Sequence, residues 1–484
     1  MPKNFFAAFA FSILCLIFSG CSTYLSETQN IRQNWAAGSA AAAQAEIEGI
    51  AKEKEGSGDE LVWLLEEGAA ARANTNFAAS DAAFKKAEDK IEIFENDTDA
   101  KILEETRALL VNQSCIPYKG YNYDKIMLSA YQAMNLLEQK KFEDAAVYLM
   151  RLDMYQKNAK DLNEKRILKD AKALEKAQKQ EAKTNSAASY DASLTLSNPA
   201  IQKQLSQIYG ADWDARASAE IRASAIYENP FAHWLTGVFF LNYHKDQADK
   251  DRALQAFERA NIMLGGKSNA VLADIAAAKK PSQRQNTTYV VFETGCAPVR
   301  NQFKIDLPIY IFARNVPQIS MNFPYLEYQK SFTQALGISA DGQPQALETL
   351  ADMDAIVKRE FNQLLPMIIT KTVISSAMKA GAQYAANQAA AHAGGEWAQL
   401  GVNIAGSIYQ TLTNDADLRT WSTLPKQIKI ARFPTPASGE VKIENGSVQV
   451  SPNATNIVFV KKMSATGGMI VRVCDFSQKK AQKN

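Results

Sequence analysis

The pattern of apolar and polar positions divides the chain into segments of three kinds. An almost unbroken apolar run covers residues 5–18. From residue 36 to residue 280 apolar side chains recur mainly at helical spacing, whereas shorter runs typical of strands occupy 289–325 and 427–473. Helical spacing returns over 351–412. This order predicts an α+β protein, mostly α, with a helical N-terminal half and strands in its C-terminal part.

Three stretches of the N-terminal half resemble tetratricopeptide-like (TPR-like) helical hairpins. In such hairpins a small residue lies where two antiparallel helices cross, and a triplet of the Ala/Phe/Ala kind lies on the second helix. The matching positions are Gly68 with Ser80, Phe84 and Ala87, Ala133 with Ala145, Leu149 and Leu152, and Gly237 with Ala253, Phe257 and Ala260. We therefore expect a TPR-like helical repeat domain over 59–280. A generic helical bundle with accidental matches is the alternative.

The strand-like runs 289–325 and 427–473 are expected to pair as one antiparallel sheet in an α/β domain over 286–475. The segment 351–412 interrupts them and would form a long helical insertion that covers one face of the sheet. The tail, 476–484, is polar and expected to be flexible.

The second part of this insertion, 367–412, is rich in Ala and Gly. Small residues let helices pack closely, and they also occur in membrane helices. Polar and charged residues such as Lys371, Lys379 and Glu396 interrupt every long apolar run, so a conventional spanning helix is not expected. We expect a buried helical hairpin that turns near Gly394. Contact with a membrane surface or with another copy of the chain is the alternative.

The apolar run at the start of the chain has the length and flanks of a secretory signal peptide. A run of about 14 residues is too short to cross roughly 30 Å of hydrocarbon. Ser19 and Gly20 are small residues directly before Cys21, and Phe18 precedes them. This arrangement resembles the bacterial lipobox, in which Leu is usual at the Phe18 position. We expect cleavage between Gly20 and Cys21, followed by acylation of the Cys21 thiol.

Acylation would fix the location of the protein. Several acyl chains on one N-terminus give stable membrane anchoring. Ser22 rather than Asp follows the cysteine, and by resemblance to Gram-negative sorting rules this favours the outer membrane, with the protein facing the periplasm. We assign 1–20 to the signal peptide and 21–58 to a lipidated tether and a first helix. An ordinary secretory signal followed by an incidental cysteine is the alternative.

Charge and cysteine content limit the classes of function. The formal net charge of the full chain is +2, which does not indicate a nucleic-acid partner. Of the 5 cysteines, Cys15 lies in the signal and Cys21 is the acylation site, which leaves Cys115, Cys296 and Cys474. If a disulfide forms, we expect Cys296 to pair with Cys474, because both lie in or beside strand-like stretches of the same predicted domain.

The sequence predicts no catalytic residues, no cofactor and no metal site. The 3 histidines have no ligand-like spacing to Cys, Asp or Glu, and neither a phosphate-binding loop nor a nucleophile elbow is found. A weak alternative is carboxylate-dependent hydrolysis by Asp352, Asp354 and Glu360. Asp352 lies near a predicted helix start, however, where a carboxylate also serves as a cap.

A group of charged residues next to a tryptophan allows two interpretations. Asp415, Asp417 and Arg419 lie close to Trp421 in the sequence. They are expected either to form a salt-bridged joint between the helical insertion and the sheet or to form a binding edge with Trp421 as its anchor.

The segment 415–425, followed by 430–434, resembles a signature of a largely uncharacterised family of Gram-negative outer-membrane lipoproteins with TPR-like N-terminal halves. The segments 293–298, 350–356 and 359–361 are also similar. The resemblance covers most of the mature chain and implies an outer-membrane lipoprotein of helical-repeat plus β type, without a known activity. It also hints at partners among lipoproteins that serve peptidoglycan synthases.

These features favour a lipid-anchored scaffold or accessory factor in the periplasm, in the context of envelope or peptidoglycan assembly. The repeats would hold an envelope protein partner on a concave face. One alternative is a cell-wall-binding or carboxylate-dependent hydrolytic enzyme. The other is a membrane-associated lipoprotein that forms oligomers through 367–412.

Overall fold

The computed structural model describes residues 24–111, 116–183, 192–211, 227–280, 283–307, 319–413 and 416–477. It is 58% helical and 17% strand, with helices in the N-terminal half and sheets in the C-terminal part. The prediction of a mixed α and β protein with a helical first half is therefore confirmed at this level. The predicted signal, the Cys21 acylation site and Asp415 lie outside the described residues.

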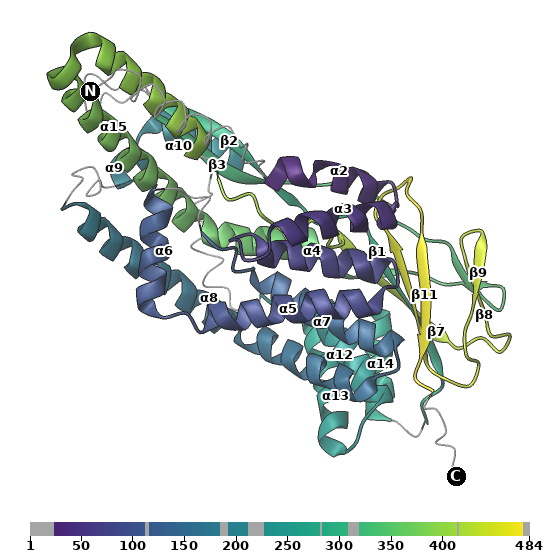
Figure 1. The fold of residues 1–484 in the computed structure, drawn as a ribbon. Coiled ribbons are helices and arrows are strands. Elements are labelled where there is room, and N and C mark those ends of the chain that lie inside the picture. Colours follow the sequence, from purple (N-terminus) through teal and green to yellow (C-terminus); the bar gives the residue numbers. More distant parts are fainter. Residues whose placement is uncertain are drawn as a thin grey trace.

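The N-terminal half is a succession of helices, and many that follow one another along the chain pack side by side (Figure 1). The helices described there are α2 (Tyr24–Ala36), α3 (Ala40–Glu53), α4 (Glu60–Ala73), α5 (Phe77–Glu95), α6 (Asp99–Val111), α7 (Asn122–Glu138), α8 (Phe142–Glu181), α9 (Ala192–Leu196), α10 (Pro199–Tyr209), α12 (Pro230–Asn242), α13 (Gln247–Met263) and α14 (Asn269–Lys279). Polar N-caps set several of their starts. The side chains of Asn76, Asp246 and Ser268 each accept a hydrogen bond from a backbone N–H in the first turn.

The α4–α5 and α12–α13 pairs approach each other closely where one helix carries a glycine. A Cβ atom on Gly68 would lie 2.3 Å from the ring of Phe84, and one on Gly237 would lie 2.6 Å from the ring of Phe257. The Ser80 hydroxyl also donates a 2.7 Å hydrogen bond to the Gly68 carbonyl across the first pair. The other residues singled out for hairpin packing are all buried as well, namely Ala87, Ala133, Ala145, Leu149, Leu152, Ala253 and Ala260.

The C-terminal part contains three sheets among the described residues. The largest has the order β11-β10-β1-β7-β6, with β1 (Thr287–Thr294), β6 (Glu348–Asp352), β7 (Gln427–Pro434), β10 (Asn456–Lys462) and β11 (Ile470–Asp475). A two-stranded ribbon joins β2 (Val299–Leu307) to β3 (Ile319–Glu327). A small sheet has the order β5-β4-β8-β9, with β4 (Ile338–Ala340), β5 (Gln343–Pro344), β8 (Glu440–Ile443) and β9 (Gly446–Gln449).

The prediction of a single antiparallel sheet is wrong. Strand β1 pairs parallel with β10 and antiparallel with β7, so the largest sheet is mixed, and the β2–β3 ribbon stands apart from it. All eight residues of β1 are buried, which fits a central strand covered on both faces. A parallel pair needs a long connection, and the chain between β1 and β10 supplies it. Strands β4 to β6 were also not predicted.

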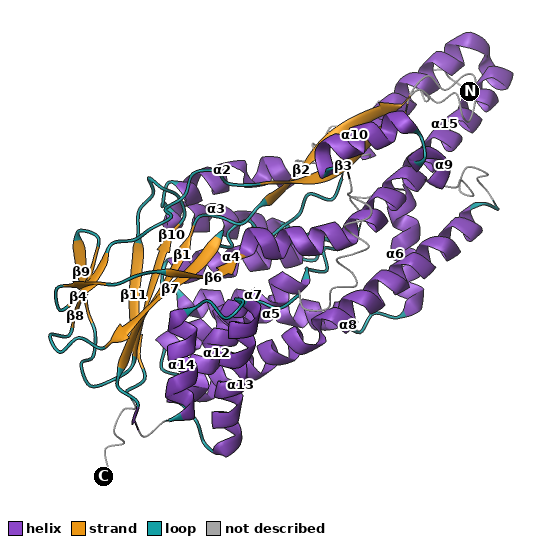
Figure 2. Cartoon of the chain, turned by 180° about the vertical axis from the view of Figure 1, so that it is seen from behind, coloured by secondary structure: helices purple, strands orange, loops and turns teal. Residues whose placement is uncertain are grey.

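Helix α15 (Met353–Thr413) lies between β6 and β7 in the chain, and these two strands pair with each other in the sheet. Its ribbon runs away from the large sheet, passes beside the β2–β3 ribbon, and turns back at the opposite end of the molecule (Figures 1 and 2). The β2–β3 ribbon, α10 and the end of α8 pack on it around a second apolar core that includes Ile305, Phe323, Ile369 and Leu205. None of the described helices has both the length and the apolar character needed to cross a membrane.

The residues expected to form a tether instead form helix α2, which is packed into the protein core. Tyr24, Thr28, Ile31 and Trp35 recur at helical spacing and are all buried. The correction has a clear physical reason, because these side chains give the otherwise polar segment one buried face. At the other end of the chain, Phe476 of the predicted tail stacks on Phe142 at 5.8 Å, and residues 478–484 lie outside the described part.

Cys296 and Cys474 do not form the expected disulfide, and both thiols are free. Register explains why. In the register of the sheet, Cys474 of β11 pairs with Ile457 of β10, and Ile457 pairs with Tyr289 of β1. Cys474 is therefore aligned with Tyr289, whereas Cys296 lies 296 − 289 = 7 residues further along the chain. At about 3.3 Å per residue the two cysteines are roughly 20 Å apart along the sheet. A disulfide needs Cα atoms within about 7 Å.

Candidate functional site

Segment 416–425, which carries most of the signature described above, lies between the helical half and the large sheet. Trp421 at its centre has 0% exposure. Its ring packs edge-on against Phe84 of α5 at 5.9 Å and Tyr131 of α7 at 5.8 Å. Trp421 therefore belongs to the core and does not fit the expected role of a surface binding anchor.

The next two residues of this segment bind a buried carboxylate of the helical half. Glu66 on α4 accepts hydrogen bonds from the backbone N–H groups of Ser422 (2.5 Å) and Thr423 (3.2 Å) and from the Thr423 hydroxyl (2.6 Å). The Tyr24 hydroxyl of α2 donates a fourth bond at 3.0 Å. Burial raises the pKa of Glu66, although these bonds oppose the shift. The segment thus locks the sheet to α2 and α4.

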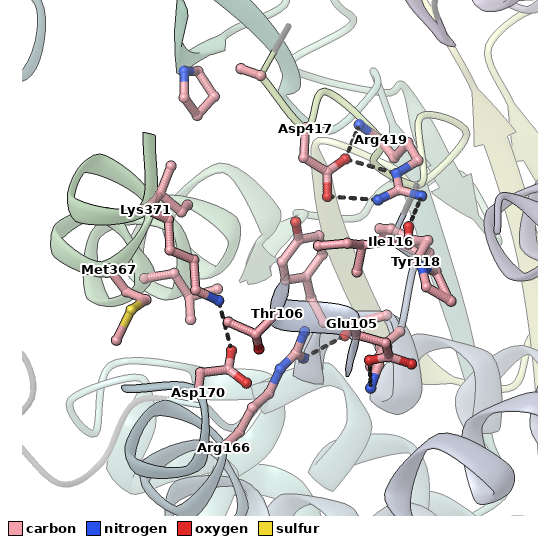
Figure 3. Close-up of a pocket in the computed structure, with 18 of the residues that line it drawn as sticks. Glu105, Thr106, Ile116, Tyr118, Arg166, Asp170, Met367, Lys371, Asp417 and Arg419 are labelled. Carbon is pink, nitrogen blue, oxygen red and sulfur yellow. Dashed lines mark hydrogen bonds and ion pairs between the residues drawn. The ribbon is translucent and has the colours of Figure 1, made fainter. Parts of the chain in front are cut away.

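Arg419 extends the joint toward a cavity. Its guanidinium donates to both carboxylate oxygens of Asp417, at 2.8 and 3.0 Å, and to Asp59 at 2.9 Å. Burial alone would raise the pKa of Asp417, but the Arg419 charge and hydrogen bonds outweigh it and lower that pKa. Asp417 and Arg419 point into the cavity from one side (Figure 3). Of the proposed binding edge, these two residues remain candidates for a site.

The cavity has a volume of about 180 Å³, is partly open to solvent and is lined by elements far apart in the sequence. Figure 3 shows Arg166 and Asp170 of α8 on one wall and Met367 and Lys371 of α15 on another. Helix α6, the 116–121 loop, β2 and β3 complete it. The apolar part of the lining consists of Ile102, Ile116, Pro117, Pro324, Leu364, Met367, Ile368 and Ala416.

Five basic side chains line this cavity, and three of them are matched by carboxylates. Arg419 binds Asp417 as described. Lys371 lies 3.4 Å from Asp170, and Lys119 lies 2.6 Å from Glu105. The remaining two are arginines, and among the described residues neither forms an ion pair.

Arg300 of β2 is the first of these two arginines. It is only 2% exposed, and its Nε atom has no hydrogen-bond partner among the described residues. Its guanidinium carbon lies 4.3 Å from the ring centre of Tyr121 and 5.3 Å from that of Phe361. The second arginine, Arg166, is half-buried and donates a 2.9 Å bond to the Gly120 carbonyl.

A buried carboxylic acid lies close to the cavity. Asp124 Oδ2 accepts hydrogen bonds from the Tyr118 hydroxyl (2.5 Å) and the Tyr121 backbone N–H (2.8 Å), while Oδ1 has no partner among the described residues. Burial raises the pKa of Asp124 to about 7, and the hydrogen bond from Tyr118 only partly opposes this. Asp124 is therefore a weak counter-charge near neutral pH.

The carboxylates considered for hydrolysis are each engaged elsewhere. Glu360 is buried and accepts hydrogen bonds from the backbone N–H groups of Asn122 (2.8 Å) and Tyr123 (3.3 Å) at the α7 N-terminus. Asp352 accepts a bond from the Ala355 N–H as a helix cap, and Asp354 pairs with Lys426. Asp352 and Asp354 also interact electrostatically with each other. Each of the three carboxylates is thus held by a contact within the described part of the chain.

A second feature lies on the helical half. Val147, Met150 and Met154 follow one face of α8 and are 49%, 42% and 51% exposed. We call these three residues the α8 stripe. Val147 also lines a groove of about 310 Å³ between α5, α7 and α8, together with Lys85, Glu88 and other polar residues.

Sequence reasoning missed Arg166 and Arg300 because nothing local marks them. They come from α8 and β2, and their proximity depends on how α8, β2 and α15 pack. Within the described ranges, no group of three or more His, Cys, Asp or Glu side chains is placed to hold a metal ion. Comparison of the chain with protein-family models, with curated proteins and with solved structures finds no match.

Proposed function

We propose that this chain is a lipid-anchored protein of the bacterial cell envelope that acts as a scaffold or accessory factor by binding a protein partner. The apolar run 5–18 and the small residues before Cys21 support acylation at that cysteine. The lipobox pattern with Ser22 supports the outer membrane, on its periplasmic side. The resemblance of 415–425 to a lipoprotein family is consistent with this location.

The pairs α4–α5, α7–α8 and α12–α13 are proposed to be TPR-like hairpins, and α15 a helical insertion between β6 and β7. Glycine against a phenylalanine ring, as in Gly68 with Phe84 and Gly237 with Phe257, is the close packing that such hairpins need. Proteins built from such hairpins commonly use one face of the stack for binding.

The observation that carries the proposal is the α8 stripe. Three large apolar side chains at i, i+3 and i+7 on one exposed helix face are typical of a surface that a partner covers. Methionine adapts its shape to a partner, and the adjoining groove offers the charges of Lys85 and Glu88 beside the apolar surface. The partner expected is an envelope protein that presents an apolar helix or strand.

Site-specific photocrosslinking in cells tests the proposal. A photoreactive residue at Met150 or Met154 is expected to give one discrete adduct, and the additional change Val147→Glu is expected to abolish it. The same residue at Ile262 on α13, which is 66% exposed, is the matched control and should give no such adduct. Absence of an adduct at both positions, or the same adducts at Ile262, would contradict a partner at the α8 stripe.

The anchor has its own test. Metabolic labelling with palmitate is expected to mark the wild-type chain and not a Cys21→Ser variant, which should leave the membrane fraction. Equal labelling of both would contradict acylation at Cys21, and an unlabelled wild type would remove the anchor altogether.

A further inference from the structure

Two arginines in the cavity between α8, β2 and α15 lack a directly paired carboxylate among the described residues, although the Glu360 carboxylate interacts electrostatically with Arg166. The other three basic residues of the lining each pair with a lining carboxylate. Arg166 and Arg300 form no ion pair among the described residues. Because an arginine remains protonated in proteins, both carry a full charge.

Arg300 is the more unusual of the two, since it is almost completely buried. A buried charge without a partner is unfavourable, so it usually has a carboxylate or an anionic ligand beside it. Asp417 and Asp124 both interact electrostatically with Arg300. Neither forms an ion pair with it, and both oxygens of Asp417 bind Arg419 instead.

Tyr121 and Phe361 hold the Arg300 side chain in place. The guanidinium lies 4.3 Å from the Tyr121 ring and 5.3 Å from the Phe361 ring. Ring faces stabilise the cation and leave the N–H groups at its edge available to an acceptor in the plane. Such a fixed planar fork suits an oxyanion, which accepts two parallel N–H bonds.

The apolar residues of the lining indicate the chemistry of the uncharged part of the ligand. Ile102, Pro324, Leu364, Met367 and Ile368 form an apolar wall. The volume of about 180 Å³ is close to that of an apolar cavity of about 150 Å³ known to accept benzene. A ligand that fills this space would therefore have a compact apolar body of about one ring.

We propose that this cavity binds a small organic oxyanion, a carboxylate or a phosphate ester with a compact apolar body, whose charge is held by Arg300 and Arg166. Tyr118 together with Leu364, Met367 and Ile368 of α15 would line the apolar part. This site is separate from the α8 stripe, so the proposal of oxyanion binding does not depend on the protein partner proposed above.

Calorimetric titration of the purified full-length chain with three ring compounds of similar size tests the proposal. Phenyl phosphate and benzoate carry the two oxyanions, and benzamide is the neutral counterpart. We expect saturable binding of at least one oxyanion and at least tenfold weaker binding of benzamide. Tighter binding of phenyl phosphate would indicate that both guanidinium groups engage a dianion, whereas tighter binding of benzoate would assign the site to carboxylates. No saturable binding of either oxyanion, or equal binding of benzamide, would overturn the proposal.

Variants locate the binding. Arg300→Gln is expected to weaken oxyanion affinity at least tenfold, and Arg166→Gln at least threefold. Arg252→Gln is the matched control, because Arg252 also stacks on a ring, that of Phe240 at 5.1 Å, and does not line the cavity. Thermal unfolding of each variant checks its fold, and Arg166→Gln, at a half-buried position, decides the question if Arg300→Gln does not fold. Wild-type affinity in both cavity variants would overturn the assignment.

Discussion

The Glu66 carboxylate on α4 accepts a 2.6 Å hydrogen bond from the Thr423 hydroxyl, which lies 357 residues further along the chain. The two residues join the helical half to the segment that leads into β7. Glu66 is fully buried and accepts four hydrogen bonds, so its contacts hold the two parts of the structure together.

Removing this carboxylate is expected to destabilise the whole protein. In Glu66→Ala the N–H groups of Ser422 and Thr423 and the Thr423 hydroxyl lose their acceptor while they remain buried. We expect the free energy of unfolding to fall by about 3–5 kcal/mol. Urea unfolding followed by tryptophan fluorescence measures this. Glu48 is exposed, and the control variant Glu48→Ala should unfold with a free energy within about 0.5 kcal/mol of wild type. An equally small change in Glu66→Ala would contradict the role of Glu66 in joining the helical half to the segment before β7.

At the two glycine–phenylalanine contacts, whether a Gly→Ala substitution stabilises or destabilises the protein depends on the room for the added methyl group. Alanine in a helix is favoured over glycine by about 1 kcal/mol. At Gly68 and Gly237, however, the added methyl would meet a buried ring at 2.3 or 2.6 Å, and overpacking costs about 1–3 kcal/mol or more. We therefore expect Gly68→Ala and Gly237→Ala to lower the melting temperature.

Gly49 on α3 is the matched control, since a Cβ added there would meet no atom within 4 Å. Gly49→Ala should raise the free energy of unfolding by up to about 1 kcal/mol. Stabilisation by all three substitutions would show that the helix pairs are not in close contact at their crossings.

Asp124 makes stability depend on pH in a defined direction. Its pKa is raised to about 7 by burial, from 3.8 for the free side chain. Between these values the folded state binds the proton and the unfolded state releases it, so stability falls as pH rises from about 4 to about 7. Asp124→Asn keeps an acceptor for Tyr118 and Tyr121 but cannot ionise.

The stability of Asp124→Asn relative to wild type should therefore increase across this pH range, by a few kcal/mol in total and roughly 1.4 kcal/mol per pH unit, and level off above pH 7. Urea unfolding at pH 4.5, 6.0 and 7.5 measures the difference. A constant difference at all three values would mean that Asp124 ionises normally in the folded protein.

Cys296, which follows β1, and Cys474 of β11 should behave as free, unreactive thiols. Burial raises the pKa of the Cys296 thiol to about 12 and also raises that of Cys474, so almost no reactive thiolate is present at neutral pH. Peptide mapping after alkylation without reductant should find both cysteines modified in urea and largely unmodified under native conditions. A peptide that links Cys296 to Cys474 would contradict the register of β1, β10 and β11.

Local spacing was enough to predict the helical half. Gly68, Ser80 and Phe84 follow one another at intervals that describe a helix crossing, and the structure brings all three together. The same kind of signal was present in Tyr24, Thr28, Ile31 and Trp35, whose i, i+4, i+7 and i+11 spacing is that of a helix with one apolar face. The polar residues between these four positions made the segment resemble a flexible tether.

Neither the pairing of the strands nor the residues of the cavity can be predicted from local sequence patterns. The parallel pairing of β1 with β10 joins segments such as Val290 and Val458 that are far apart in the sequence. Both strands are buried along almost their whole length, and burial on both faces does not decide the direction of pairing. Arg166 and Arg300 likewise become neighbours of one cavity only through the packing of α8 against α15 and β2. Their sequence surroundings are those of ordinary surface arginines.

The docking of α2 restricts how far an acylated protein would reach. Only Ser22 and Thr23 separate Cys21 from Tyr24, the first residue of the packed helix. Three residue steps of about 3.5 Å span at most roughly 10 Å. With so short a linker, the folded part of an acylated protein would lie against the headgroups of the bilayer. Any partner would have to bind it close to the membrane surface.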